Sequence, residues 1–381
     1  MVEGVMGLFD GAAGQGDWAS TAHIARLLHL PIVLVIDCAH LSNSVAAIAH
    51  GYRSFDPRLH LAGVILNRVG SDRHLQFLQE ALAPLALPIL GVLRRQAAIT
   101  IPDRHLGLVP TDELPEFSQL IERLAKMGTD CFDWQQLRPL LATPRSSSTF
   151  TSLSSPLETK TSAVPPIRIA IARDRAFNFY YADNLDLLTA LGAELIPWSP
   201  LTDTDLPPKI QGLYLGGGFP ELFAATLSAN HPARSAVQRA IAAGMPTYAE
   251  CGGLMYLCAG IIDFQEQEFP MVGCLPSRAV MQQRLILGYR QATALQDSPL
   301  LTAGTCIWGH EFHHSSLHPQ PTAPLYHLRG HERNSPTWEE GWRLEHLHAS
   351  YVHLHWGGQP ELPMRFVQHC RRYRRPSDQQ P

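Results

Sequence analysis

Residues 246–257 read PTYAECGGLMYL, and this stretch decides the fold of the C-terminal half of the chain. A short apolar run ends at Glu250, Cys251 follows it, and Gly252 and Gly253 open a helical pattern over residues 254–258. A strand that turns sharply into a helix exposes the residue at the turn, and glycines there let a substrate approach the backbone. The pattern therefore predicts an α/β domain with Cys251 presented as a nucleophile.

Short apolar runs alternate with helical patterns on both sides of this stretch. In the N-terminal half, strands are predicted at residues 31–37, 61–67 and 88–93, with a helix at 42–52 between the first two. In the C-terminal half, strands are predicted at 167–172, 194–198, 212–215 and 246–249, with helices at 184–191, 221–227 and 233–243. A β-α-β-α-β order favours parallel sheets covered by helices.

The length of 381 residues favours two domains, because one hydrophobic core rarely serves so long a chain. Residues 142–166 are rich in serine, threonine and proline and have little to bury, as is typical of a linker. We therefore predict a first domain at residues 1–141, a linker at 142–166, a second domain at 167–370 and a polar tail at 371–381.

The composition is that of a globular protein without a nucleic-acid partner, with 45% hydrophobic residues, 17% charged residues and a net charge of −4. The seven cysteines contain no CxxC pair, which argues against a disulfide framework and a structural zinc site. No signal peptide and no membrane-spanning run is visible. We expect a cytoplasmic protein without a membrane partner.

A nucleophilic cysteine needs a base and a site for the oxyanion. His353, within the alternating strand-like residues 350–356 (SYVHLHW), is the candidate base. Backbone amides at Gly252 and at the loop containing Gly217 and Gly218 are candidate oxyanion donors. An arbitrary cysteine is more often a small buried hydrophobe, which is our interpretation of the other six cysteines, and an arbitrary histidine is more often a core residue. Cys251 differs from the other cysteines by its place at the predicted strand-to-helix turn, and His353 differs from the other histidines by its place in the strand-like segment near the end of the domain.

Four ordered motifs together resemble the glutaminase domain of the cobyrinic acid a,c-diamide synthases. They are LGGGFPELFA at 215–224, YAECGGLMYL at 248–257, GHEFHHS at 309–315 and ASYVHLHW at 349–356. The resemblance implies a class I glutamine amidotransferase domain of flavodoxin-like fold. It implies that Cys251 attacks the amide of L-glutamine, with His353 as its base, and that Gly217, Gly218 and Gly252 bind glutamine or the oxyanion.

The chain departs from the wider class at one position. Class I glutaminases generally carry His-x-Glu, whereas this chain has a leucine and then His355 after His353, so we expect a Cys–His dyad. Glu250 and Glu311 are each either an orienting group or a structural carboxylate. The histidines of residues 310–318 resemble a family segment that is not a metal site, and we expect none there.

The segment EGVMGLFDG at 3–11 resembles the amidoligase domain of the same family, as do PIVLVID, AGVILNRVGS and IPDRHLGLV further on. That domain is similar in fold to P-loop proteins and dethiobiotin synthetase, and uses ATP and Mg²⁺ to phosphorylate a corrin carboxylate. The resemblance implies that Glu3 and Asp10 lie near magnesium, phosphate and substrate, with Glu3 as a metal ligand. It places Asn67 and Arg68 near adenine, although a plain strand-end turn also explains this pair.

None of the three lysines fits a G-x-x-x-x-G-K-[ST] loop. The sequence opens where the family has already passed its first strand and phosphate loop, so we expect an N-terminally incomplete amidoligase domain. Either the sequence is a fragment or the ATP-dependent half-reaction is lost. We expect glutaminase geometry to remain and complete amidation to fail.

The family resemblance implies amidation of the c and then the a carboxylate of cobyrinate in cobalamin biosynthesis. L-glutamine and ATP are the other substrates, and a homodimer is the candidate assembly. Two alternatives stay open: hydrogenobyrinate, which lacks cobalt, as the substrate, or a chain that retains only glutaminase or binding function.

Overall fold

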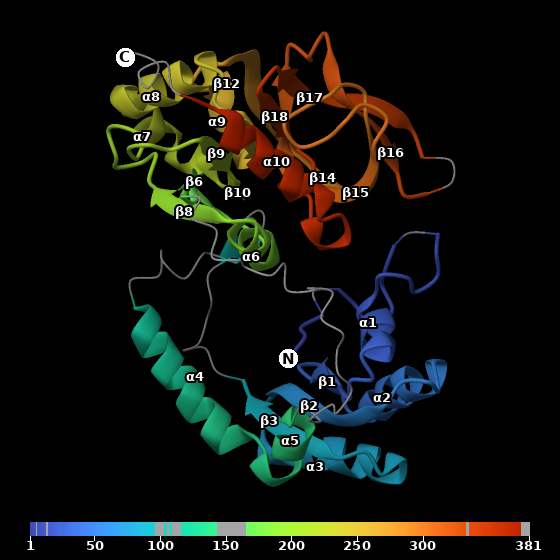
Figure 1. Ribbon diagram of the computed structural model, residues 1–381. Coiled ribbons are helices and arrows are strands. Elements are labelled where there is room, and N and C mark those ends of the chain that lie inside the picture. Colours follow the sequence, from blue (N-terminus) through green and yellow to red (C-terminus); the bar gives the residue numbers. More distant parts are fainter. Residues whose placement is uncertain are drawn as a thin grey trace. The chain divides into compact units, whose positions relative to one another are not determined.

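The computed structural model describes residues 1–4, 6–12, 14–95, 116–142, 165–332 and 335–374, and the backbone of 103–104 and 107–108. The chain forms two compact units, Met1–Phe150 and Thr151–Pro381 (Figure 1). Most of the predicted linker, most of the IPDRHLGLV segment and residues 375–381 of the predicted tail lie outside the described residues.

The first unit contains a parallel sheet in the order β1-β2-β3 (Figure 1). Its elements are α1 (Thr21–Leu27), β1 (Ile32–Asp37), α2 (Ser44–Phe55), β2 (Leu61–Val69), α3 (Asp72–Leu82), η1 (Ala83–Leu85), β3 (Ile89–Arg94), β4 (Asp103–Arg104), β5 (Gly107–Leu108), α4 (Phe117–Cys131) and α5 (Trp134–Leu141). The predicted β-α-β-α-β order of this half is confirmed.

Branched apolar side chains hold this sheet against its helices. Ile36 of β1 and Val64 of β2 are buried in one cluster with Val45 of α2 and Leu78 of α3. Side chains also fix where helices begin: the hydroxyl of Ser71 accepts a hydrogen bond from His74 N at the start of α3.

The second unit is built on an eleven-stranded sheet whose neighbours β8, β6, β9, β11 and β18 are all parallel. These strands are β6 (Ile167–Ala172), β8 (Ala193–Trp198), β9 (Gly212–Leu215), β11 (Thr247–Glu250) and β18 (Leu347–Ser350). The helices of the unit are α6 (Ala182–Ala190), α7 (Ala224–Ala229), α8 (His231–Ala242), α9 (Gly252–Leu257) and α10 (Glu361–Arg372). The predicted α/β fold is confirmed in this half too.

The other part of the sheet is mostly antiparallel and was not anticipated from the sequence. It comprises β12 (Cys258–Ile262), β13 (Glu268–Pro270), β14 (Leu275–Ala294), β15 (Cys306–His318), β16 (Pro324–Gly330) and β17 (Thr337–Leu344). The long β14–β15 hairpin carries the GHEFHHS segment. A separate small pair joins β7 (Phe177–Phe179) to β10 (Gly217–Gly218), and η3 (Pro220–Phe223) follows it.

The predicted strand at residues 350–356 is wrong, because β18 ends at Ser350 and η4 (Trp356–Gly358) begins soon after. Side-chain acceptors replace ladder partners there. The Ser350 hydroxyl accepts from Val352 N, and the Glu250 carboxylate accepts from Leu354 N. His353 therefore lies on a turn that makes one isolated bridge to His310.

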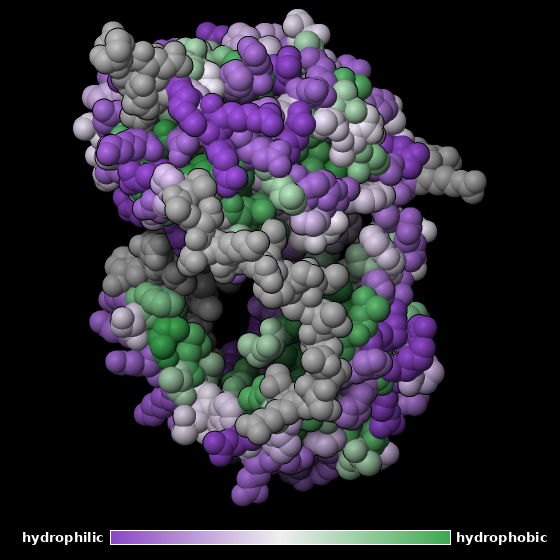
Figure 2. Space-filling model, in the orientation of Figure 1, coloured by the Kyte–Doolittle hydropathy of each residue, from purple (hydrophilic) through white to green (hydrophobic). Residues whose placement is uncertain are grey.

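Helix α10 covers the parallel strands with an amphipathic face. Phe366, Val367 and Cys370 are buried in a cluster with Ile169 of β6, whereas the outward side of α10 is hydrophilic in Figure 2. No helix in the described part of the chain is both long and apolar enough to cross a membrane.

The tightest backbone approach beside α9 gives a stability prediction. A Cβ on Gly253 would lie 2.2 Å from the carbonyl oxygen of Leu215 in the neighbouring strand, so Gly253→Ala forces α9 away from β9. We expect a loss of about 1–3 kcal/mol in the free energy of unfolding, measured by chemical denaturation. The exposed Gly358, whose Cβ would meet nothing within 4 Å, is the matched control. Equal stabilities of the two alanine variants would contradict this prediction.

Candidate active site

Cys251 occupies a strained turn between β11 and α9, with φ 50° and ψ −102°. This left-handed backbone is uncommon for a residue with a side chain and often marks a functional site. The Cys251 N–H donates to Ser350 O of β18 at 2.8 Å, and the Gly253 N–H donates to Gly216 O at 3.0 Å. The end of β18 and the residue that follows β9 thus fix the turn.

The imidazole of His353 lies between the thiol of Cys251 and the carboxylate of Glu250. Its Nδ1 is 3.1 Å from Glu250 Oε1, and its ring also hydrogen-bonds the Cys251 side chain. Burial alone would lower the pKa of His353. The negative charges of the Cys251 thiolate and Glu250, with hydrogen bonds to both, instead raise that pKa to about 10. The site therefore favours the protonated, imidazolium form of His353.

Glu250 holds this arrangement from the other side. It is 1% exposed, and its Oε2 accepts from Leu354 N at 3.1 Å and from the Tyr248 hydroxyl at 2.5 Å. The dyad expected from the sequence is therefore corrected to a row of three side chains. Of the two carboxylates left open, Glu250 contacts the histidine, whereas Glu311 pairs with Arg290 at 2.6 Å.

The three predicted glycines lie around the same turn. A Cβ on Gly217 would be 2.8 Å from His353 Cε1, and a Cβ on Gly252 would be 3.1 Å from Gly218 N. Gly218 has φ 155° and no room for a side chain beside the carbonyl oxygen of Ala176. The glycine loop and the turn at Cys251 therefore approach each other at backbone distance, as an oxyanion site requires.

A second buried carboxyl group supports the turn from behind. Glu340 of β17 lies 2.6 Å from the Ser350 hydroxyl and accepts from Tyr351 N at 2.8 Å. Burial, aided by the charge of Glu311, raises the pKa of Glu340 to about 8, although the hydrogen bonds with Ser350 and Tyr351 oppose this. Sequence reasoning missed Glu340, because only the paired strands β17 and β18 bring it to the site.

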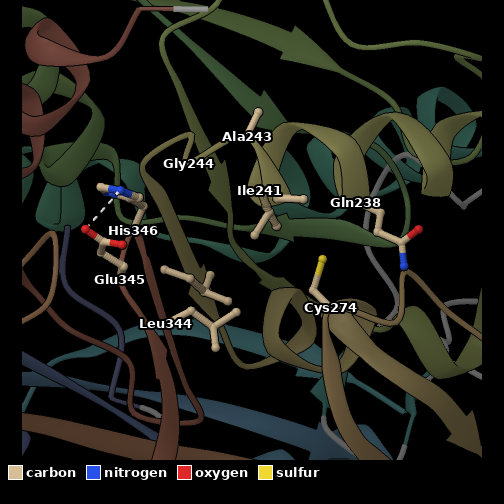
Figure 3. Close-up of a pocket in the computed structure, with 10 residues that line it drawn as sticks. Gln238, Ile241, Ala243, Gly244, Cys274, Leu344, Glu345 and His346 are labelled. Atoms are coloured by element: carbon tan, nitrogen blue, oxygen red, sulfur yellow. Dashed lines mark ion pairs between the residues drawn. The ribbon is translucent and has the colours of Figure 1, made fainter. Parts of the chain in front are cut away.

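A cavity of about 460 Å³ lies elsewhere, lined by residues that include Ile241, Gly244, Cys274 and His346 (Figure 3). Gly244 precedes β11 and His346 precedes β18, so this cavity is at the amino ends of those strands. Cys251 follows the carboxyl end of β11. The cavity therefore plays no part in chemistry at Cys251.

The predicted nucleotide-site residues lie in the first unit. Glu3 and Asp10 are exposed in the segment before α1, and Asn67 and Arg68 lie near the carboxyl end of β2. Arg68 has φ 60° and pairs with Asp37, at the end of β1, at 2.9 Å. The described residues contain no group of three or more side chains that could hold a metal ion.

The comparisons with known proteins agree with this geometry. Residues 168–361 match the CobB/CobQ-like glutamine amidotransferase domain, and residues 9–109 match the CobQ/CobB/MinD/ParA nucleotide binding domain. The α/β fold, with its cysteine, histidine and carboxylate at one turn, thus defines a glutamine amidotransferase joined to a nucleotide-binding domain.

Among relatives, the chain is 60% identical over 97% of its length to the cobyrinate a,c-diamide synthase of Synechococcus sp., and covers 80% of that protein. It is 52% identical to the enzyme of the same name from Synechocystis sp., covering 76% of it. It is 42% identical to the hydrogenobyrinate a,c-diamide synthase of Streptomyces coelicolor, covering 81% of it. In the comparisons with the Synechocystis and Streptomyces enzymes, 97% of the chain aligns. The chain belongs to the cobyrinate a,c-diamide synthase family.

The raised pKa of Glu340 predicts a pH-dependent effect on stability. Unfolded glutamate ionises near pH 4.3, whereas folded Glu340 keeps its proton to about pH 8, so the native state loses stability as pH rises through this interval. Glutamine reproduces the protonated acid, because its carbonyl accepts from Tyr351 N and its amide donates to Ser350 Oγ. We expect Glu340→Gln to lie close to wild type at pH 5 and to exceed it by at least about 1–2 kcal/mol at pH 8, since each pK unit of the interval corresponds to about 1.4 kcal/mol.

Thermal unfolding at the two pH values measures this difference, which corresponds to a rise in Tm of roughly 2–8 °C at pH 8. A variant less stable than wild type at pH 8 would contradict a protonated Glu340.

Proposed function

We propose that this chain hydrolyses L-glutamine at Cys251 to supply ammonia for the ATP-dependent amidation of the a and c carboxylates of cobyrinate. This proposal replaces the failure of amidation expected from the sequence, because residues 9–109 match a nucleotide binding domain and the relatives at 60% and 52% identity are named for the complete reaction. The observation that carries the proposal is the buried, hydrogen-bonded row of Glu250, His353 and Cys251 on a strained turn. The relatives, which are named for cobyrinate, indicate the substrate, and the match to a glutamine amidotransferase domain indicates the amide donor.

In the proposed reaction the Cys251 sulfur attacks the side-chain amide carbon of glutamine, and the thiol proton resides on His353. Backbone N–H groups near Gly217, Gly218 and Gly252 stabilise the oxyanion. His353 gives its proton to the leaving nitrogen, so the C–N bond breaks and ammonia departs. Water then cleaves the glutamyl thioester and releases glutamate.

Glu250 keeps His353 in the correct tautomer for these transfers. A carboxylate that accepts from Nδ1 leaves Nε2 directed at the sulfur, and stabilises the imidazolium while it carries the proton. Because Glu250 precedes the nucleophile, it replaces the carboxylate that most class I glutaminases carry two residues after the histidine.

We assign ATP-dependent amidation to residues 1–141 and glutamine hydrolysis to residues 167–370, joined by 142–166, with a tail at 371–381. Magnesium prefers one or two carboxylates together with phosphate oxygens, so the exposed Glu3 and Asp10 suit it without a third protein ligand. Bound Mg²⁺ would neutralise phosphate charge. Asn67 and Arg68, near the carboxyl end of β2, lie where ligands bind to parallel sheets, which supports their assignment to the nucleotide.

Two finer assignments complete the proposal. The cobalt-containing corrin is favoured over hydrogenobyrinate because the relatives at 60% and 52% identity are named for cobyrinate, against 42% for hydrogenobyrinate. We propose a homodimer as the assembly, which size-exclusion chromatography with light scattering tests directly. A monomer at micromolar concentration would contradict it.

Release of glutamate from glutamine tests the proposed nucleophile without requiring the amidation step. We expect the wild-type chain to produce glutamate and Cys251→Ser to reduce its rate at least about 10³-fold. Cys258→Ser is the matched control, because this buried cysteine follows the same helix but only donates to Leu254 O. Equal activity of the two serine variants would contradict the role of Cys251.

The position of Glu250 predicts a large effect of a small change. Glu250→Gln keeps the shape of the side chain but removes the negative charge that faces His353, so we expect kcat to fall about 10²–10⁴-fold with little change in KM. Glu311→Gln is the control, since Glu311 pairs with Arg290 instead. Steady-state kinetics measures both; a greater kcat loss in the Glu311 variant would reverse the assignment.

A further inference from the structure

One side of the His353 ring is covered by a second histidine from the β14–β15 hairpin. The rings of His310 and His353 are stacked, with centroids 4.9 Å apart and planes inclined by 15°. Phe179 contacts the His353 ring edge-on at 5.1 Å, and Gly217 lies beside Cε1. Glu250 and Cys251 are hydrogen-bonded to the same ring, so His310 completes its enclosure. His353 is only 4% exposed.

The backbone fixes this stack. His353 N donates to His310 O at 2.8 Å, and His310 N donates to His353 O at 3.2 Å, which forms the isolated bridge between β15 and the turn after β18. A Cβ on Gly309 would lie 2.5 Å from His353 O, so the bridge forms because the residue before His310 has no side chain. The Tyr181 hydroxyl lies 3.4 Å from Nδ1 of the His310 ring.

From this geometry we infer that His310 is a positioning residue for the glutaminase reaction: its ring covers His353, excludes water from it and holds it against Cys251. The inference rests on the function proposed above. His310 touches neither the sulfur nor the amide in this assignment and acts through His353 alone. The sequence motif GHEFHHS thereby acquires a role for its first two residues.

The charge state of His310 suits this role. Burial and the positive charge of His353 lower the pKa of His310 to about 4, with Arg290 contributing in the same direction and Glu250 and Glu311 opposing. Tyr181 faces the ring as a neutral phenol, because burial raises its pKa further above the working range. A neutral ring can stack on an imidazolium without repulsion. The exclusion of water from this side of the ring also lowers the local dielectric, which strengthens the attraction between an imidazolium and a thiolate.

Two substitutions at His310 distinguish the effect of a ring that covers His353 from any effect specific to a histidine side chain. His310→Ala removes the cover, whereas His310→Phe restores a flat neutral ring of similar size and leaves the backbone bridge intact. His327→Ala is the control, because His327 is an exposed histidine on β16 of the same sheet. Glutamine hydrolysis is measured in the full chain, together with the pH profile of Cys251 alkylation by iodoacetamide, read by peptide mass spectrometry.

We expect His310→Ala to lower kcat about 10- to 100-fold, because a small misplacement of a catalytic group has effects of this size. KM should change less than about threefold, since the bound glutamine loses no contact. The alkylation profile should move to higher pH, and His310→Phe should restore kcat to within about threefold of wild type. His327→Ala should behave as wild type.

If the His310→Ala variant kept the kcat and the alkylation profile of the wild-type chain, the inference would be overturned. Equal losses in the alanine and phenylalanine variants would overturn it as well, because a covering ring would then not be what matters. A wild-type chain without glutaminase activity would instead refute the proposed function itself.

Discussion

The left-handed backbone at Cys251 is the constraint on which the rest of the site depends. A residue with a side chain at φ 50° stores strain of about 1–3 kcal/mol, which only surrounding structure can offset. Here the carbonyl oxygen of Ser350 in β18 accepts a hydrogen bond from Cys251 N. The lack of side chains at Gly252 and Gly253 lets α9 pack against Gly218 of the glycine loop and against β9. If the turn relaxed, the sulfur would leave both the imidazole and the backbone donors.

The same strand that ends at this turn supplies the carboxylate. Tyr248 and Glu250 are two residues apart in β11, so they share one face of the sheet, and the tyrosine hydroxyl donates to the carboxylate. Glu250 also accepts from Leu354 N, which ties the turn carrying His353 to β11. In a dry site these bonds act in a low dielectric, where fixed charges attract more strongly than in water. Burial thus serves both the position and the charge of His353.

The parallel strands of both units could be predicted because their signals are local. Apolar runs such as residues 167–172 and 246–249 and the glycines after Cys251 report on neighbours in sequence. The strands β12 to β17 are mostly antiparallel, and their pairing joins segments that lie well apart in sequence, such as Arg290 of β14 and Gly330 of β16. For the same reason sequence could not choose between Glu250 and Glu311, since Glu250 contacts a histidine 103 residues away. Glu340 reaches the site only through the pairing of β17 with β18 and gave no local signal. His310 stands in the GHEFHHS motif, but its contact with His353 depends on a bridge between distant segments.

Covalent trapping by the glutamine analogue 6-diazo-5-oxo-norleucine, read by peptide mass spectrometry, tests most directly whether Cys251 is the nucleophile that His353 activates. We predict a single adduct on Cys251 in the wild-type chain and at least about 10²-fold slower labelling in His353→Ala, because the reactivity of the thiol depends on the imidazole. Labelling at a different cysteine, or labelling of Cys251 at an unchanged rate without His353, would contradict it.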